Sequence, residues 1–151
     1  MRGVAMVLTT LAVASDSLAA QDRELPPIIP GVLEAYRTVG ARGAVGALAR
    51  AALFPVDSTE SGPLLVQFVK IEATYGRMVG YDLVRDIHVG EHLRQTYFVI
   101  LHERGPAFWE FVSYHAPERW RFLAYRFDTD PRKVLPPDMW PQPAVPQQPP
   151  Q

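Results

Sequence analysis

The chain has 151 residues, a length typical of one domain, and its contents of 48% hydrophobic and 21% charged residues are ordinary for a globular protein. Its formal net charge of -1 provides no broad electrostatic attraction to nucleic acid or to anionic lipid, so we expect neither as a partner. Because the chain has no cysteine, disulfides, thiol chemistry and cysteine-based zinc sites are excluded. We also expect no cofactor.

Residues 1–20, "MRGVAMVLTTLAVASDSLAA", have the layout of a secretory signal peptide. Arg2 supplies a positive charge, an apolar run extends from Val4 to about Ala14, and small residues follow. The run is shorter than the roughly 20 residues that span a bilayer, so we expect no transmembrane segment once it is cleaved. An uncleaved anchor and a buried helix are the alternatives. We therefore expect a periplasmic or secreted protein, and the sequence does not separate these two locations.

Helices are predicted for the next part of the chain, after an extended, proline-containing lead-in at residues 21–30. Residues 31–54 space their apolar side chains at three and four, which predicts two helices broken near Gly40 and Gly43. A further helix is predicted before Gly76. The apolar stripes of these helices are Val32, Leu33, Tyr36 and Val39, then Val45, Leu48, Ala52 and Leu53, then Leu64, Leu65, Phe68, Ile71 and Tyr75.

After Gly80 the apolar spacing changes to two, which is typical of strands. Four strands are predicted, and short turns such as Arg104-Gly105 join them into an antiparallel meander. Helices followed by strands predict an α+β fold, with N-terminal helices packed on a curved four-stranded antiparallel β-meander over residues 31–130. Residues 131–151 are rich in proline and glutamine, which predicts a disordered or polyproline tail. The predicted strands cover residues 81–89, 94–103, 107–115 and 120–128.

Both faces of this predicted sheet are apolar, whereas the strands of a sheet with one solvent-exposed face would alternate apolar and polar residues. The register assumes a two-residue turn at Arg104-Gly105 and a loop over residues 115–119, and a one-residue error in either turn exchanges the faces beyond it. One face then carries Phe98, Ile100, Trp109, Phe111, Leu123, Tyr125 and Phe127.

The opposite face carries a second set of large side chains, and the helices can cover only one side. Something else must therefore meet this face, because so large an exposed apolar surface is unusual in a monomer. We expect a homodimer through it, with a different partner or a ligand as alternatives. The predicted interface residues are Tyr97, Phe108, Glu110, Tyr114, Phe122 and Arg126.

The segments "YGRMVGYDLVRDIHV", "LRQTYFVILHERGPAFWEFVSYH" and "RWRFLAYRFDTD" carry a resemblance to a known superfamily. Over residues 31–130 the chain resembles the cystatin-like or ketosteroid-isomerase-like α+β group, also called nuclear transport factor 2-like, and its small exported proteins of unknown function. The resemblance implies a cone-shaped fold, a pocket between helices and sheet, and often a dimer through the sheet. Members of that group include isomerases, dehydratases and binding modules, so the resemblance does not specify a function.

Two metal-like patterns occur near the first predicted hairpin. "HVGEH", from His88 to His92, matches a zinc metalloprotease signature that needs both histidines on one helical face. Here Gly90 and the period of two place it at a strand end instead, so we interpret it as a chance match. Asp86 and His88 share one side of a strand but have no evident third ligand, and we expect no metal site.

Glu110 lies among aromatic residues, where a carboxylate has a raised pKa and suits acid–base catalysis. Tyr97 and Tyr114 lie on the same predicted face, but we favour an ion pair between Glu110 and Arg126. A pocket with polar residues at its mouth and aromatic walls is the other candidate site. Its predicted ligand-binding residues are Trp109, Tyr125, His102, Ser113 and Arg121.

No candidate acid or base has a convincing partner in the sequence, so our leading hypothesis is an exported module that binds small molecules or proteins without catalysis. The first alternative is a small-molecule enzyme of the isomerase or hydrolase type that uses a pocket between helices and sheet. The second is a structural component of an envelope complex. The expected partners are accordingly a second copy of the chain, a small apolar ligand or an envelope protein.

Overall fold

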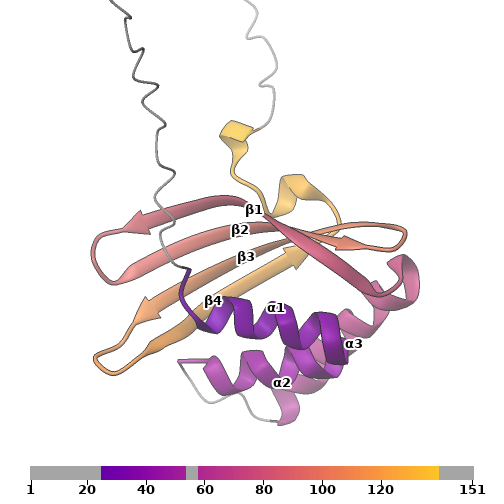
Figure 1. The fold of residues 1–151 in the computed structure, drawn as a ribbon, viewed down its shortest axis with the longest axis horizontal. Coiled ribbons are helices and arrows are strands. Elements are labelled where there is room, and N and C mark those ends of the chain that lie inside the picture. Colours follow the sequence, from indigo (N-terminus) through magenta and orange to yellow (C-terminus); the bar gives the residue numbers. More distant parts are fainter. Residues whose placement is uncertain (1–24, 54–57, 140–151) are drawn as a thin grey trace, which may run out of the picture.

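The computed structural model of the protein describes residues 25–53 and 58–139. The predicted signal peptide, the first part of the lead-in and the proline-rich residues 140–151 lie outside the described residues. Three helices come first and a four-stranded antiparallel sheet follows, so the predicted α+β class is confirmed. Figure 1 shows the helices gathered on one face of the curved sheet, with the segment that follows the last strand on the opposite face.

The three helices are α1 (Ile28–Val39), α2 (Ala41–Ala51) and α3 (Ser58–Tyr75). The start of α1 corrects the predicted lead-in, because its first three residues fall within the stretch expected to be extended. Pro30 is tolerated there because a first helical turn has no internal partner for its N–H groups. Among the described helices, none combines the length and hydropathy that a bilayer-spanning segment needs.

The break between α1 and α2 is at Gly40, as the glycine spacing predicts. Its φ of 79° lies in the left-handed region that favours glycine. The carboxylate of Glu72 on α3 accepts a hydrogen bond of 2.9 Å from the amide of Ala41, the first residue of α2. Glu72 thus satisfies one of the free N–H groups of α2 and ties the three helices together.

The sheet consists of β1 (Met78–Val89), β2 (Leu93–His102), β3 (Gly105–His115) and β4 (Trp120–Asp128), in that order. The first strand begins three residues before the prediction, and the other boundaries differ by at most two residues. His102 pairs with Gly105, so the β2–β3 turn is Glu103-Arg104 and not Arg104-Gly105. This moves each predicted β2–β3 pair by two positions, which leaves the side chains on the predicted faces.

The β3–β4 pairing differs in a way that does exchange faces. Val112 pairs with Ala124 but Ser113 pairs with Phe122, so Leu123 is the extra residue of a β-bulge. Phe122 therefore points to the helices and is 2% exposed, while Leu123 is 43% exposed. The predicted places of these two residues were wrong, and Phe122 does not belong to the interface surface predicted for it.

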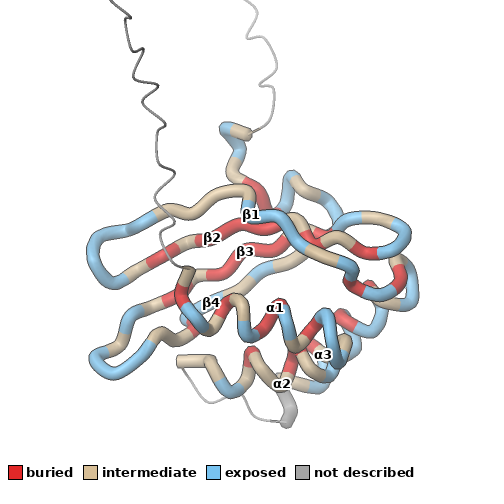
Figure 2. The backbone as a smooth tube through the Cα atoms, in the orientation of Figure 1, coloured by how far each residue is buried: buried red, intermediate tan, exposed pale blue. Residues whose placement is uncertain are grey.

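The core lies between the helices and the face of the sheet toward them, which we call the inner face (Figure 2). Trp109 is at its centre, with its ring centroid 4.9 Å from that of Phe68 and 5.5 Å from that of Tyr36. Val39 was predicted to share the buried stripe of α1, but it is 68% exposed because α1 ends there. The fully buried large side chains include Ile29, Leu33, Tyr36, Leu48, Phe68, Phe98, Ile100 and Phe111.

The opposite, outer face of the sheet is partly covered by the chain itself. Residues 129–139, which we call the strap, form two short 3-10 turns (Pro131–Lys133 and Pro137–Met139) and bury Val134 and Leu135. The expectation of a disordered tail from Pro131 onward is therefore wrong for these residues. A homodimer through the parts of the outer face beside the strap stays a prediction, which the native mass of the mature chain tests.

The strap crosses the sheet above one row of outer-face side chains, one from each strand: Arg85, Tyr97, Glu110 and Arg126. Arg126 donates a hydrogen bond of 3.2 Å to the carbonyl of Val134. At the other end of the row, Arg85 forms a 2.8 Å ion pair with Asp138. The strap therefore runs from the edge at β4 to the edge at β1.

We predict that Leu33→Ala and Val39→Ala, on the same helix, differ sharply in stability. Leu33 is 0% exposed, so its truncation should lower the free energy of unfolding by about 2–5 kcal/mol. Val39→Ala should change it by less than about 0.5 kcal/mol, because an exposed side chain loses little on truncation. Urea denaturation of both variants measures this, and equal losses would show that α1 is rotated relative to the described fold.

We also predict that Leu135→Ala lowers the free energy of unfolding by about 2 kcal/mol or more, because Leu135 belongs to the buried part of the strap and is only 7% exposed. The same urea experiment measures the loss. Arg132→Ala, in the exposed part of the strap, is the control and should stay close to the wild type. A Leu135→Ala protein as stable as the wild type would mean that the strap does not pack on the sheet.

Candidate functional site

The five predicted ligand-binding residues do not come together in one place. Trp109 is 2% exposed in the core. His102 and Ser113 both face the helices but lie far apart, because His102 pairs with Gly105 while Ser113 is at the other end of β3, roughly 27 Å away along a strand. The Ser113 hydroxyl is buried and has no hydrogen-bond partner among the described residues. Tyr125 is half-buried on β4.

His102 is held by Tyr36 inside the core. The Tyr36 hydroxyl and the His102 Nε2 are 3.0 Å apart, and the two residues are 1% and 6% exposed. Burial lowers the pKa of His102 and raises the pKa of the Tyr36 phenol, so both groups are neutral at physiological pH. This neutral, hydrogen-bonded pair joins α1 to β2 and is a structural feature of the core.

Glu110 is paired with Arg126, as predicted. Its carboxylate lies 2.5 Å from the guanidinium and also accepts hydrogen bonds from Gln95 and, at 3.4 Å, from Tyr97. Burial raises the pKa of Tyr97, and the charge of Glu110 adds to this effect. The carboxylate is thus engaged on both oxygens below the strap. Tyr97 and Glu110 are buried, whereas Phe108 and Tyr114 are half-buried and Arg126 is exposed, all on the outer face.

The metal-like patterns lie on a hairpin and not on a helix, as the period of two predicts. His88 is near the end of β1, and Gly90 and His92 lie in the turn that follows. The Asp86 carboxylate forms an ion pair with Arg94, whose side chain is 6% exposed, and lies 3.6 Å from His88 Nε2. Within the described residues, no group of three or more acidic or histidine side chains is placed to hold a metal ion.

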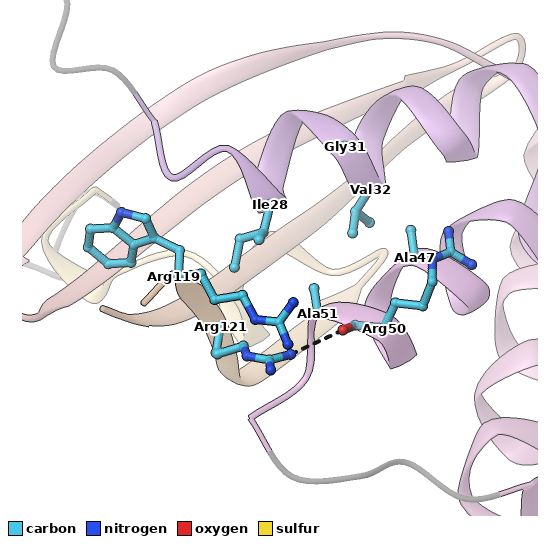
Figure 3. A pocket seen from close by; sticks show the side chains of 9 residues that line it. Ile28, Gly31, Val32, Ala47, Arg50, Ala51, Arg119 and Arg121 are labelled. Carbon is cyan, nitrogen blue, oxygen red and sulfur yellow. Dashed lines mark hydrogen bonds between the residues drawn. The ribbon is translucent and has the colours of Figure 1, made fainter. Parts of the chain in front are cut away.

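An open groove of about 270 Å³ lies where α1 and α2 meet the β3–β4 hairpin (Figure 3). Helix side chains such as Ile28, Val32 and Ala47 form an apolar floor. Figure 3 shows the side chains of Arg119 and Arg121 reaching from the β3–β4 hairpin toward the C-terminal end of α2. We call this the arginine groove, and its lining residues are Ile28, Gly31, Val32, Ala47, Arg50, Ala51, Arg119, Trp120 and Arg121.

Three guanidinium groups line this groove, and none of the described lining residues is acidic. Arg121 donates a hydrogen bond of 3.3 Å to the carbonyl of Arg50, at the negative C-terminal end of α2. The Arg50 guanidinium folds back over Gly46, where an added Cβ would lie 3.3 Å from its Nη1. Among the described residues, neither Arg50 nor Arg119 has an ion-pair partner. The groove thus combines an apolar floor with unneutralised positive charge.

Sequence reasoning identified Arg121 as a ligand-binding residue but missed Arg50, Arg119 and Trp120. Arg50 and Arg119 come from a helix end and a loop far apart in the chain, so no motif joins them. Trp120 reaches the groove because the bulge in β4 shifts the pairing of the residues before it, and the sequence pattern does not show this bulge. The sequence carried a partial signal for this groove, because "ERWR" puts two arginines beside a tryptophan at the end of a predicted hairpin.

Comparison with protein-family models finds no match to the chain. Comparison with curated proteins finds no significantly similar sequence. The function therefore has to be argued from the residues and their geometry.

We predict that acid destabilises the fold partly through His102. Because its pKa is lower in the folded protein than the ordinary value of about 6.5, the unfolded chain takes up this proton more readily. The contribution is therefore intact above about pH 6.5 and is lost as the pH falls below it. His102→Gln, which keeps a polar group for Tyr36, should flatten the fall of the unfolding free energy between about pH 7 and about pH 5.

The control for this experiment is His115→Gln, which removes an exposed histidine at the end of β3. That variant should follow the wild-type pH profile. A His102→Gln protein that loses stability on acidification as steeply as the wild type would rule out His102 as the source.

Proposed function

We propose that the protein is an exported binding module whose arginine groove takes up small molecules that combine an apolar body with an anionic group. The observation that carries this proposal is the gathering of Arg50, Arg119 and Arg121 around an apolar floor, with no acidic residue in the part of the lining that the structure describes. Guanidinium groups form strong, charge-assisted hydrogen bonds with carboxylate and phosphate oxygens. The export rests on residues 1–20, which have the pattern of a signal peptide.

Binding is favoured over catalysis by the chemistry of this lining. Arginine remains protonated at physiological pH and therefore cannot act as a general base. The titratable groups that a catalyst would use, His102 and Glu110, are buried elsewhere with partners of their own. The groove offers shape, apolar surface and positive charge, which suffice for recognition.

The size of the groove limits the ligand. At about 270 Å³ it lies just below the usual range for drug-sized ligands, so it fits a small molecule or one end of a longer chain. Its walls come from both the helices and the sheet. In the cystatin-like or ketosteroid-isomerase-like group the pocket also lies between helices and sheet, and this supports a relationship to that group as part of the proposal.

The test is a titration with anilinonaphthalene sulfonate, a fluorescent amphipathic anion, followed by competition with octanoate. We predict that Arg119→Gln weakens the affinity for both by roughly tenfold, because loss of one charge-assisted hydrogen bond of about 1.4 kcal/mol has that effect. Octanol, which lacks the carboxylate, should compete poorly.

The matched control is Arg42→Gln, which removes the same charge from an exposed position on α2 outside the groove. It should bind both anions as the wild type does. Equal weakening in the two variants would indicate attraction by net charge alone and would contradict a site in the groove.

A further inference from the structure

A second groove lies on another part of the molecule, between α3 and the edge of the sheet at β4. It consists of two adjoining hollows of about 350 and 360 Å³, which share Gln67 and Phe127. One hollow extends toward Tyr75 at the end of α3, and the other extends toward Pro63 near its beginning. We call this the α3–β4 groove. It has no lining residue in common with the arginine groove.

The groove follows the second half of β4, an edge strand whose outer side has, near its end, no neighbouring strand among the described residues. Near the start of the strand, Ala52 and Leu53 cover this edge, since the Leu53 amide donates a 2.7 Å hydrogen bond to the Phe122 carbonyl. From Arg126 to Asp128, the described residues pair with this strand only from β3. Open strand edges present backbone groups to an extended segment.

The lining has the chemistry of a polyproline site. Tyr75, Tyr125 and Phe127 contribute aromatic surface, and Gln67 contributes a side-chain amide. Grooves that bind proline-rich segments use aromatic rings against the prolines and polar side chains for the exposed carbonyls. Of the three charged lining residues, Arg126 pairs with Glu110 and Asp128 pairs with Lys133, while Lys70 is exposed to solvent. A ligand without negative or positive side chains therefore fits the paired part of this groove.

The chain carries such a ligand directly after its described part. Residues 140–151, "WPQPAVPQQPPQ", contain no charged residue and have proline at nearly every second or third position. Polyproline geometry has no internal hydrogen bonds and rises about 3.1 Å per residue, so the segment spans up to about 37 Å.

This length reaches the groove from the point where the segment begins. Met139 follows Asp138, which pairs with Arg85 on β1, so the start lies three strand spacings, about 14 Å, from β4. A return across the sheet leaves about 23 Å of the polyproline length, or roughly seven residues, to lie along the open edge. The segment is therefore long enough to occupy both hollows.

We propose that the α3–β4 groove binds the chain's own proline-rich segment, residues 140–151, in an extended conformation. The segment then closes the open edge of β4 and covers the aromatic lining. This inference is independent of the arginine groove, because the two grooves share no residues.

The experiment uses the mature full-length chain with one substitution, Val145→Cys. Since the natural chain has no cysteine, a nitroxide label attaches at this position alone. We expect the label to broaden the NMR amide signals of Gln67 and Phe127 strongly and to leave that of Glu118, in the β3–β4 loop beyond the far end of β4, nearly unchanged. Broadening spread evenly over the surface, or absent from the groove, would overturn the proposal.

Two further variants of the labelled chain make the result specific. Gln67→Arg adds bulk and charge at the residue shared by both hollows and should abolish the broadening, whereas Val66→Arg, at an adjacent position that is 67% exposed, should not. Equal broadening in both variants would contradict binding in the groove. Broadening that disappears on dilution would assign the segment to a second copy and overturn the intramolecular form of the proposal.

Discussion

A sheet that is apolar on both faces needs a cover on both faces, and the rest of this structure depends on that requirement. The three helices bury the inner face, where Trp109, Phe98 and Phe111 lie. The strap crosses the outer face, where it buries Val134 and Leu135 over a row that includes Tyr97 and Glu110. A chain without disulfides depends on this two-sided burial for its stability, since the hydrophobic effect is the largest favourable contribution to folding.

The polar residues within these layers follow from the same requirement. Burying a charge without a partner is costly, and the two ionised side chains that are buried among the described residues, Glu110 and Arg94, are both paired. Glu110 pairs with Arg126 beneath the strap, and Asp86 pairs with Arg94 on the inner face. Arg126 also donates a hydrogen bond to the carbonyl of Val134, which holds the strap against the same row of residues. On the outer face, the same residue, Arg126, therefore both neutralises the charge of Glu110 and holds the strap that covers it.

The fold was largely predictable because its signals are local. The change from a spacing of three and four to a spacing of two after Gly80 marked the transition from helices to strands, and the glycine at position 40 marked the break between α1 and α2. The bulge at Leu123 was not predictable, because Phe122 and Leu123 are both large and apolar and either one satisfies the pattern. The strap was missed because a proline-rich composition indicates a lack of regular structure, and it does not exclude short 3-10 turns that pack on a sheet.

The candidate site was much less predictable, and the reason lies in how charge is distributed. A single sequence shows which residues are charged, but only the fold shows which charges have partners. Glu110 attracted attention in the sequence because it lies among aromatic residues, yet it is fully engaged by Arg126, Gln95 and Tyr97. Arg50 and Arg119 attracted none, although they have no acidic partner among the described residues. A charge without an ionic partner beside apolar surface is available to a ligand, whereas a paired charge is not. The proposed function therefore rests on Arg50 and Arg119 and not on Glu110.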